Sequence, residues 1–234
     1  MLHPPQLRYC LPTSVEPLQR RKKMFQREAE AVHVLLQQRA ELANVPLQDD
    51  VAQKLEAYLE LLTRWNRTIN LTSLPLEPPT AASVDRLLIE PLSAIPFLSP
   101  HVTVWFDLGS GGGSPAIPLQ IAHPARQLKM VESKERKAAF LREVVRELGL
   151  AGAEVLTTRI ESLVDQDDSR ATADLVTVRA VRLSASLFSQ LDLLLKPGGQ
   201  AALFGTTAQK LDLPRALEIQ FIEPSVILLR RTHS

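Results

Sequence analysis

The sequence predicts an α/β fold, a mostly parallel sheet with helices on both faces, preceded by a helical N-terminal part. Two observations indicate the sheet. Short β-rich runs alternate with helical segments after Pro100, and a cluster of glycines follows the first of these runs. A third observation indicates the helical part, because apolar residues before residue 70 recur at the spacing of one helix face.

The N-terminal part is predicted to hold two helices behind a basic tail. Residues 1–23 contain four prolines and the start of a basic run at Arg20, so we expect a flexible tail. The basic run is either a solvated helix start or a phosphate-contacting arm. Translation from Met24 would leave 22 basic and 25 acidic residues, a net charge of −3. One helix is expected from Met24 to about Ala43 and another from about Leu47 to Arg67.

The second half is predicted to alternate between strands and helices. The β-rich runs are residues 101–110, 127–133, 154–160, 173–181 and 200–205. The clearest helix between them covers 134–148, with a buried stripe that ends before Gly149. Residues 218–231 predict two strands that meet at Glu223-Pro224, a hairpin at the sheet edge. We therefore expect a helical extension over 24–100 and a Rossmann-like domain over 101–234.

Composition excludes several classes of protein. The chain has 27 basic and 26 acidic residues, a formal charge of +1, and 45% hydrophobic residues. Its apolar runs are far shorter than the ~20 residues of a membrane helix. The single cysteine, Cys10, excludes a disulfide framework, and the five histidines are scattered, so we predict no metal site. We expect a cytoplasmic globular protein, and the near-zero charge argues against tight, indiscriminate binding of RNA.

The strongest local signal is the glycine-rich run FDLGSGGGSPAIP at residues 106–118. A strand ends at Asp107-Leu108, glycines follow, and a helix is predicted to begin near Ser114-Pro115 with the serine as its N-cap. Such a loop lets a ligand lie against the backbone beyond the carboxyl ends of the strands. A phosphate-binding P-loop is excluded, but the dinucleotide spacing Gly111-x-Gly113-x-x-Ala116 keeps a nucleotide-dependent oxidoreductase open.

Two acids favour S-adenosylmethionine as the ligand. Asp107 stands two residues before Gly109 and would repel a pyrophosphate, whereas it would attract the ammonium and sulfonium of S-adenosylmethionine. Glu132 ends the second strand, where an acid accepts hydrogen bonds from the ribose hydroxyls of an adenosine cofactor. Either acid also has a purely structural interpretation: Asp107 in a capped turn, and Glu132 as a cap of the next helix.

These residues resemble the RsmG family, also called GidB, whose bacterial members methylate guanine N7 in 16S ribosomal RNA. Five sequence blocks carry the resemblance in the family's order, over about residues 47–205. They are RWNRTINLTSL at 64–74, DLGSGGGSPAIPLQIAHP at 107–124, VESKERKAAFLREVVRELGL at 131–150, VTVRAV at 176–181 and LLKPGGQAALFG at 194–205.

The resemblance implies a class I methyltransferase fold with a seven-stranded sheet and a helical N-terminal extension. It also implies a set of cofactor-binding residues: the family's S-adenosylmethionine positions fall on Gly109, Ser114, Ile160, Glu161 and Arg179, in addition to Asp107, Gly111 and Glu132. The implied partner is 16S ribosomal RNA or the small ribosomal subunit, and we expect a monomer. A divergent relative that binds cofactor or RNA without transferring methyl groups is the alternative.

The sequence departs from the family's pattern at several places. Where the family often has His-x-x-Asp-Ser, this chain has Leu87, Glu90 and Pro91. Ala116 replaces a glycine of the glycine loop, and Phe204 stands where the family has a lysine. The cofactor half of the pattern matches better than the RNA-facing half.

The implied reaction needs no general base, because guanine N7 already carries a free lone pair at neutral pH. Catalysis would come from placing the reacting atoms in line, and we name no proton-transfer residue. Arg159 and Arg179, expected at the ends of the third and fourth strands, are the candidates for positioning, although each is also compatible with a plain salt bridge.

Two further segments of the sequence can each be interpreted as either structural or functional. In the block at residues 64–74, Trp65 is either a core residue above two helix-ending asparagines, or part of a corner that packs over the cofactor loop. The basic residues of helix 134–148, together with Arg64 and Arg67, form either a phosphate-binding face or a solvated face paired with Glu135, Glu143 and Glu147.

Overall fold

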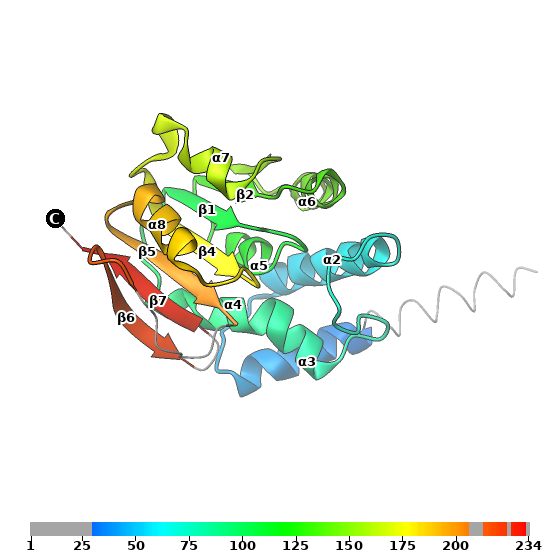
Figure 1. Cartoon of the computed structure of the whole chain (residues 1–234). Coiled ribbons are helices and arrows are strands. Elements are labelled where there is room, and N and C mark those ends of the chain that lie inside the picture. Colours follow the sequence, from blue (N-terminus) through cyan, green and yellow to red (C-terminus); the bar gives the residue numbers. More distant parts are fainter. Residues whose placement is uncertain (1–29, 206–212, 224–225, 233–234) are drawn as a thin grey trace, which may run out of the picture.

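A computed structural model describes residues 30–205, 213–223 and 226–232 (Figure 1). Its centre is a seven-stranded sheet in the order β3-β2-β1-β4-β5-β7-β6. Strands β1 to β5 are parallel, and β7 runs antiparallel to both β5 and β6. The predicted α/β class and the C-terminal hairpin are therefore confirmed, with β6 at the edge and β7 inside it.

The strands follow the predicted runs closely, with one correction. Their bounds are β1 Val104–Leu108, β2 Gln127–Val131, β3 Ala153–Leu156, β4 Ala173–Arg179, β5 Leu195–Phe204, β6 Leu217–Glu223 and β7 Val226–Arg231. The prediction that the third strand runs over 154–160 is wrong, because pairing with β2 ends at Leu156 and helix α7 starts at Ile160. Arg159 therefore precedes a helix instead of ending a strand.

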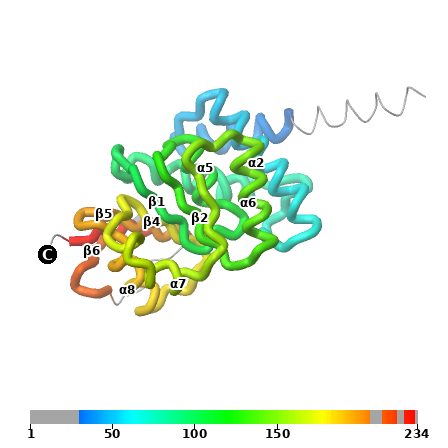
Figure 2. Tube along the Cα trace, turned by 90° about the horizontal axis from the view of Figure 1, so that it is seen from above, coloured from blue at the N-terminus to red at the C-terminus, as the bar shows by residue number. Residues whose placement is uncertain are grey.

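Helices cover both faces of the sheet (Figure 2). One face packs against α2 (Asp49–Asn66), α5 (Ala116–Ala122) and α6 (Glu135–Glu147), and the other against α7 (Ile160–Val164) and α8 (Ala185–Leu194). Neighbouring residues of β1 show why both faces are filled: Trp105 belongs to the first hydrophobic cluster and Phe106 to the second. Such doubly covered strands are apolar almost throughout.

The N-terminal part is helical, as expected. Residues 30–42 are helical, and α2 confirms the second predicted helix. Short helices follow as α3 (Ala81–Val84), the π-helical turn η1 (Asp85–Ile89), α4 (Glu90–Ser93) and the 3₁₀ turn η2 (Ile95–Phe97), with a further 3₁₀ turn, η3 (Asp167–Ser169), after α7. The basic tail and the first part of the helix predicted from Met24 lie outside the described residues.

The helical extension and the sheet share one hydrophobic cluster. Leu36, Leu55 and Leu88 from the helices belong to the same buried cluster as Trp105 and Leu175 from the sheet. The division at residue 100 is therefore a change of secondary structure across a continuous core, and as a domain boundary it remains our proposal. Within the described ranges no helix meets the length and hydrophobicity that a bilayer span requires.

Candidate functional site

The glycine loop lies between β1 and α5, at the carboxyl edge of the sheet. The amides of Gly109 and Ser110 both donate to the carbonyl of Val131, at 2.9 and 3.1 Å, which fastens the loop to the end of β2. Gly113 has a φ of +91°, and a Cβ there would lie 2.8 Å from Cγ1 of Ile117. The sequence therefore needs glycine at this position for both conformation and space.

Ser114 does not cap the helix that follows. Pro115 holds the N-cap position of α5, and the Ser114 hydroxyl donates instead to the carbonyl of Leu87, at 2.7 Å. The predicted capping role is wrong, because the N-cap position falls on Pro115 and the Ser114 hydroxyl bonds to η1. Ser114 thus joins the glycine loop to the N-terminal extension.

Asp107 is buried beneath the loop, with 1% of its surface exposed. The Thr177 hydroxyl donates to its Oδ1, while its Oδ2 has no hydrogen-bond partner in the described part of the chain. Burial is the main cause that raises the pKa of this carboxyl, to about 6. A buried carboxylate oxygen without a donor is costly, so this oxygen is suited to a cationic partner.

The orientation of Asp107 depends on two residues that sequence reasoning missed. The register of β1 and β4 places Asp107 opposite Thr177. The indole N–H of Trp105 donates to Oγ1 of Thr177, at 2.9 Å, and the Thr177 hydroxyl then donates to Asp107. Only the strand register reveals this chain of hydrogen bonds, although the i, i+2 spacing of Trp105 and Asp107 already placed them on one face.

Glu132 occupies the place predicted for the acid at the end of the second strand. Its Oε2 accepts from the Gly111 amide, at 2.9 Å, and its Oε1 from the Lys134 amide, at 2.7 Å. It is 6% exposed. Each carboxylate oxygen has a second lone pair, so both can also accept from a ribose hydroxyl. Glu132 thus supports the glycine loop and keeps acceptors for a ligand.

Helix α2 contacts the glycine loop from the other side through Tyr58. Its hydroxyl donates to the carbonyl of Gly112, at 2.6 Å, and its ring lies 3.4 Å from the point that a Gly113 Cβ would occupy. The segment after α2 also touches the loop, because a Cβ on Gly112 would lie 3.2 Å from the Leu71 carbonyl oxygen.

Both interpretations of the block at residues 64–74 hold in part. Asn66 accepts from the amides of Leu71 and Thr72 and donates to the Thr72 carbonyl, which closes the turn after α2. The Trp65 ring packs 5.9 Å from Phe140 between centroids, and its indole donates to Glu143. The block is therefore structural in its own contacts, and it holds Leu71 against the glycine loop.

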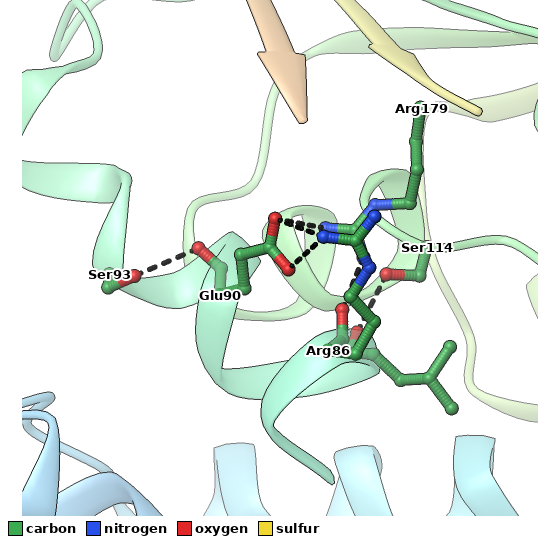
Figure 3. Close-up of polar contacts among 6 residues, drawn as sticks. Arg86, Glu90, Ser93, Ser114 and Arg179 are labelled. Carbon is green, nitrogen blue, oxygen red and sulfur yellow. Dashed lines mark hydrogen bonds and ion pairs between the residues drawn. The ribbon is translucent and has the colours of Figure 1, made fainter. Parts of the chain in front are cut away.

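Arg179 ends β4 and points into the N-terminal extension (Figure 3). Its Nη1 donates to the Arg86 carbonyl, its Nη2 lies 3.6 Å from Oε1 of Glu90, and its guanidinium lies 5.2 Å from the Phe204 ring centroid. Burial is the main cause that lowers the pKa of Arg179, to about 10, while the charge of Glu90 opposes that shift. Sequence reasoning named Arg179 but missed Arg86 and gave Glu90 only as a departure.

The remaining predicted site residues lie farther along the same edge. Arg159 is the exposed N-cap of α7, whereas Ile160 is partly buried and Glu161 is exposed in its first turn. The structure therefore groups Asp107, the glycine loop and Glu132 closely, with Arg179 on the β4 side. Arg159, Ile160 and Glu161 follow β3, and their roles remain predictions.

The basic face of α6 is paired in part, since Arg142 and Arg146 have acidic partners, whereas Lys134, Arg136 and Lys137 form no ion pair with a described residue. Arg64 contacts Glu143, Arg142 contacts Glu135, and Arg146 contacts Glu147. These pairs agree with the solvated interpretation, in which Glu135, Glu143 and Glu147 are the partners, and the phosphate-binding alternative stays a prediction for the remaining cations. Within the described ranges there is no group of three or more histidine, cysteine or acidic side chains with the arrangement of a metal site.

The departures from the family's pattern are all buried. Leu87 is 6% exposed, Ala116 is fully buried and Phe204 is 1% exposed. Phe204 places an uncharged ring beside Arg179. The guanidinium lies over this ring in a cation–π contact, which is favourable for the positive charge.

Comparison with known proteins agrees with this geometry. A family model described as rRNA small subunit methyltransferase G, GidB, matches residues 51–220. A ribosomal RNA small subunit methyltransferase G from Stenotrophomonas maltophilia is 41% identical over 160 residues, which cover 68% of this chain and 70% of that protein. The Neisseria gonorrhoeae protein of the same name is 35% identical, with 70% and 75% covered.

Solved structures agree on the fold alone. The putative methyltransferase yhhF from Escherichia coli superposes with a TM-score of 0.52 at 14% identity, covering 69% of this chain and 92% of that one. A mutant of MtNAS in complex with S-adenosylmethionine gives a TM-score of 0.52 at 14% identity, covering 77% and 75%. The family model matches most of the chain, and these curated members of the family share 35% and 41% identity with it. The chain therefore belongs to the family of rRNA small subunit methyltransferase G.

Proposed function

We propose that this protein transfers a methyl group from S-adenosylmethionine to N7 of a guanine in 16S ribosomal RNA. The observation that carries the cofactor assignment is the buried Asp107 carboxylate, whose Oδ2 lacks a donor within the described ranges. It suits a cationic group and disfavours a pyrophosphate. The RNA assignment is supported by the relatives, which are named for the small-subunit RNA on which they act.

The residues present fit that cofactor. Asp107 would hold its ammonium, Glu132 would accept from its ribose, and the glycine loop would let it approach the backbone. When bound, the cofactor supplies a methyl group activated by a positively charged sulfur. The protein's own task is orientation, because guanine N7 has no proton to remove before it reacts.

The finer assignments belong to the same proposal. We take the substrate to be 16S RNA or the small subunit, the protein to be a monomer, and its compartment to be the cytoplasm. The described part of the chain supports the substrate only through its family.

Two experiments test the proposal. Calorimetry should detect binding of S-adenosylmethionine and no binding of NAD, and binding of NAD alone would overturn the cofactor assignment. Mass mapping of 16S RNA should then show one N7-methylguanosine that disappears in a deletion strain and returns with the restored gene. Persistence of that methyl group in the deletion strain would show that another enzyme makes it.

The hydrogen bond from Tyr58 in α2 to the glycine loop gives a first variant to test. Tyr58→Phe removes the donor to the Gly112 carbonyl and leaves that buried acceptor unsatisfied. We expect a loss of ~1–2 kcal/mol in the free energy of unfolding, and weaker cofactor binding because the loop is less fixed. Urea unfolding and calorimetry measure the two effects.

Thr63→Val is the matched control for Tyr58→Phe. It removes a hydroxyl from the same helix, but that hydroxyl bonds only to the Leu59 carbonyl inside α2. Cofactor affinity should be unchanged in this control. Equal affinities for the Tyr58 variant and the native protein would mean that the phenol does not help to shape the loop.

A further inference from the structure

Three charged side chains meet where β4 and β5 end, and they are not saturated (Figure 3). Arg86 Nη1 donates to both carboxylate oxygens of Glu90, at 3.0 and 2.9 Å, and Nη2 of Arg179 lies 3.6 Å from Oε1 of the same carboxylate. The Glu90 and Arg179 side chains are only 8% and 10% exposed. Two cations thus share one carboxylate within this cluster: the Arg86 side chain is 39% exposed to solvent, whereas Arg179 is largely buried and also lies within the electrostatic influence of Asp107.

The Arg179 guanidinium has N–H groups that no acceptor in the described part of the chain takes. Nε and Nη2 of Arg179 are buried and make no hydrogen bond to any described residue. A guanidinium has five N–H groups, and those that no acceptor of the protein takes can donate to the anionic group of a ligand. Here Arg179 is held at Nη1 by the Arg86 carbonyl and faces Glu90 through Nη2, while Nε and the second N–H of Nη2 stay available.

The cluster lies on the element that also contacts the glycine loop. Arg86 and Glu90 are one helical turn apart across η1 and α4, and the Leu87 carbonyl between them accepts from Ser114. A π-helical turn such as η1 is frequent at functional sites. Gly205 leaves room for the Arg86 side chain, since a Cβ there would collide with the guanidinium.

We propose that Glu90, held by Arg86, is a positioning residue that fixes the Arg179 guanidinium with its open donors directed at the carboxylate of S-adenosylmethionine. This inference rests on the proposed function and adds a role to a position where the family often has aspartate. Asp107 and Arg179 would then hold opposite charges of one zwitterionic end. The ammonium faces the buried acid, and the carboxylate faces the buried guanidinium.

The test is a double-mutant cycle on the full-length protein, with dissociation constants for S-adenosylmethionine from calorimetry. Glu90→Gln should weaken binding roughly tenfold, and Glu90→Asp should restore it to within about twofold. In an Arg179→Gln background, Glu90→Gln should have no further effect, because its influence passes through Arg179. Native affinity in Glu90→Gln, or additive losses in the double variant, would overturn the inference.

Asp192→Asn is the matched control. Asp192 pairs with Arg231 at 2.9 Å, and Arg231 donates to the Leu195 carbonyl, so the arrangement repeats that of Glu90, Arg179 and the Arg86 carbonyl. It lies at the opposite edge of the sheet, where β5 begins. The control should lower thermal stability and leave the dissociation constant unchanged.

A cofactor-independent readout separates this inference from the proposed function. The Nε–H resonance of Arg179, assigned by its loss in Arg179→Gln, should exchange with solvent at least about tenfold faster in Glu90→Gln. Unchanged exchange would show that Glu90 does not fix the guanidinium. If the native protein binds no S-adenosylmethionine, the proposed function fails, and the exchange rates still decide whether Glu90 positions Arg179.

Kinetics with RNA as the second substrate show which anion Arg179 contacts. Glu90→Gln should raise the KM for S-adenosylmethionine more than the KM for RNA. A raised KM for RNA with an unchanged dissociation constant for S-adenosylmethionine would place the contacted anion on a phosphate of the RNA. That result would overturn the assignment to the cofactor.

Discussion

Asp107→Asn is expected to weaken S-adenosylmethionine binding by about 10- to 100-fold while making the free protein more stable at neutral pH. The first effect follows from the loss of a charge-assisted contact, worth ~1.5–3 kcal/mol. The second follows from burial, because the native carboxylate must remain ionised in the interior at pH 7 with its Oδ2 unpartnered.

The pH dependence fixes the sign of the stability effect. Burial raises the pKa of Asp107 to about 6, above the ~3.9 of an unfolded aspartate. Between those values the folded state holds more protons than the unfolded state, so stability falls as pH rises and the loss levels off about one unit above the folded-state pKa. The total is on the order of 3 kcal/mol. Urea unfolding from pH 3.5 to 7.5 should show this decline, and Asp107→Asn should flatten it.

The affinity for the cofactor should change with pH in the direction opposite to that of stability. An ammonium beside Asp107 favours the ionised form, so the affinity for S-adenosylmethionine should increase as pH rises through about 6. Binding near pH 5.5 should release protons, which calorimetry detects as a dependence of the apparent enthalpy on the buffer. Proton release that survives in Asp107→Asn would assign the titration to another group.

Asp174→Asn is a control of opposite sign. Asp174 is also buried in the sheet, but it accepts from the amides of Thr103 and Val104 and pairs with Lys196. Burial alone would raise its pKa, and these donors outweigh burial and hold that pKa below its usual value. This variant should lose stability at neutral pH and retain cofactor affinity, because Asp174 stands at the amino end of β4.

Periodicity and glycine placement were sufficient to predict the sheet, its flanking helices and the position of the glycine loop. The first four strands were found because doubly covered strands are short apolar runs bounded by turn residues. The third strand was predicted too long, since Thr157 and Thr158 have high β propensity, whereas pairing with β2 had already ended at Leu156. The β propensity of a segment does not reveal where the neighbouring strand stops pairing with it.

The site was only half predictable, for a related reason. Asp107, the glycines and Glu132 lie close together in sequence around one strand–loop–helix unit, so their spacing carries information. Tyr58, Thr177 and Glu90 reach the site from elements far away in the chain, and nothing local distinguishes them from core or surface residues. Ser114 shows the limit most clearly, because its hydroxyl bonds to Leu87 in η1 and not to the helix that it precedes.

Thr177→Val is expected to destabilise the protein more than any other conservative change at this site. Valine matches threonine in shape but cannot accept from the Trp105 indole or donate to Asp107. Each group left without a partner costs ~1–3 kcal/mol, so we expect a loss of roughly 3 kcal/mol at pH 7.5.

The pH profile separates this loss from an ordinary packing defect. The Thr177 hydroxyl is one of the groups that lower the pKa of Asp107, so its removal should raise that pKa further above 6. The Thr177→Val variant should therefore lose more stability at pH 7.5 than at pH 5. Thr177→Ser keeps the hydroxyl and removes only a buried methyl group, so its loss should be near ~1 kcal/mol and nearly independent of pH. Equal losses for the valine and serine variants would mean that packing of the methyl groups, and not the hydrogen bonds from Trp105 through Thr177 to Asp107, sets the stability of this part of the sheet.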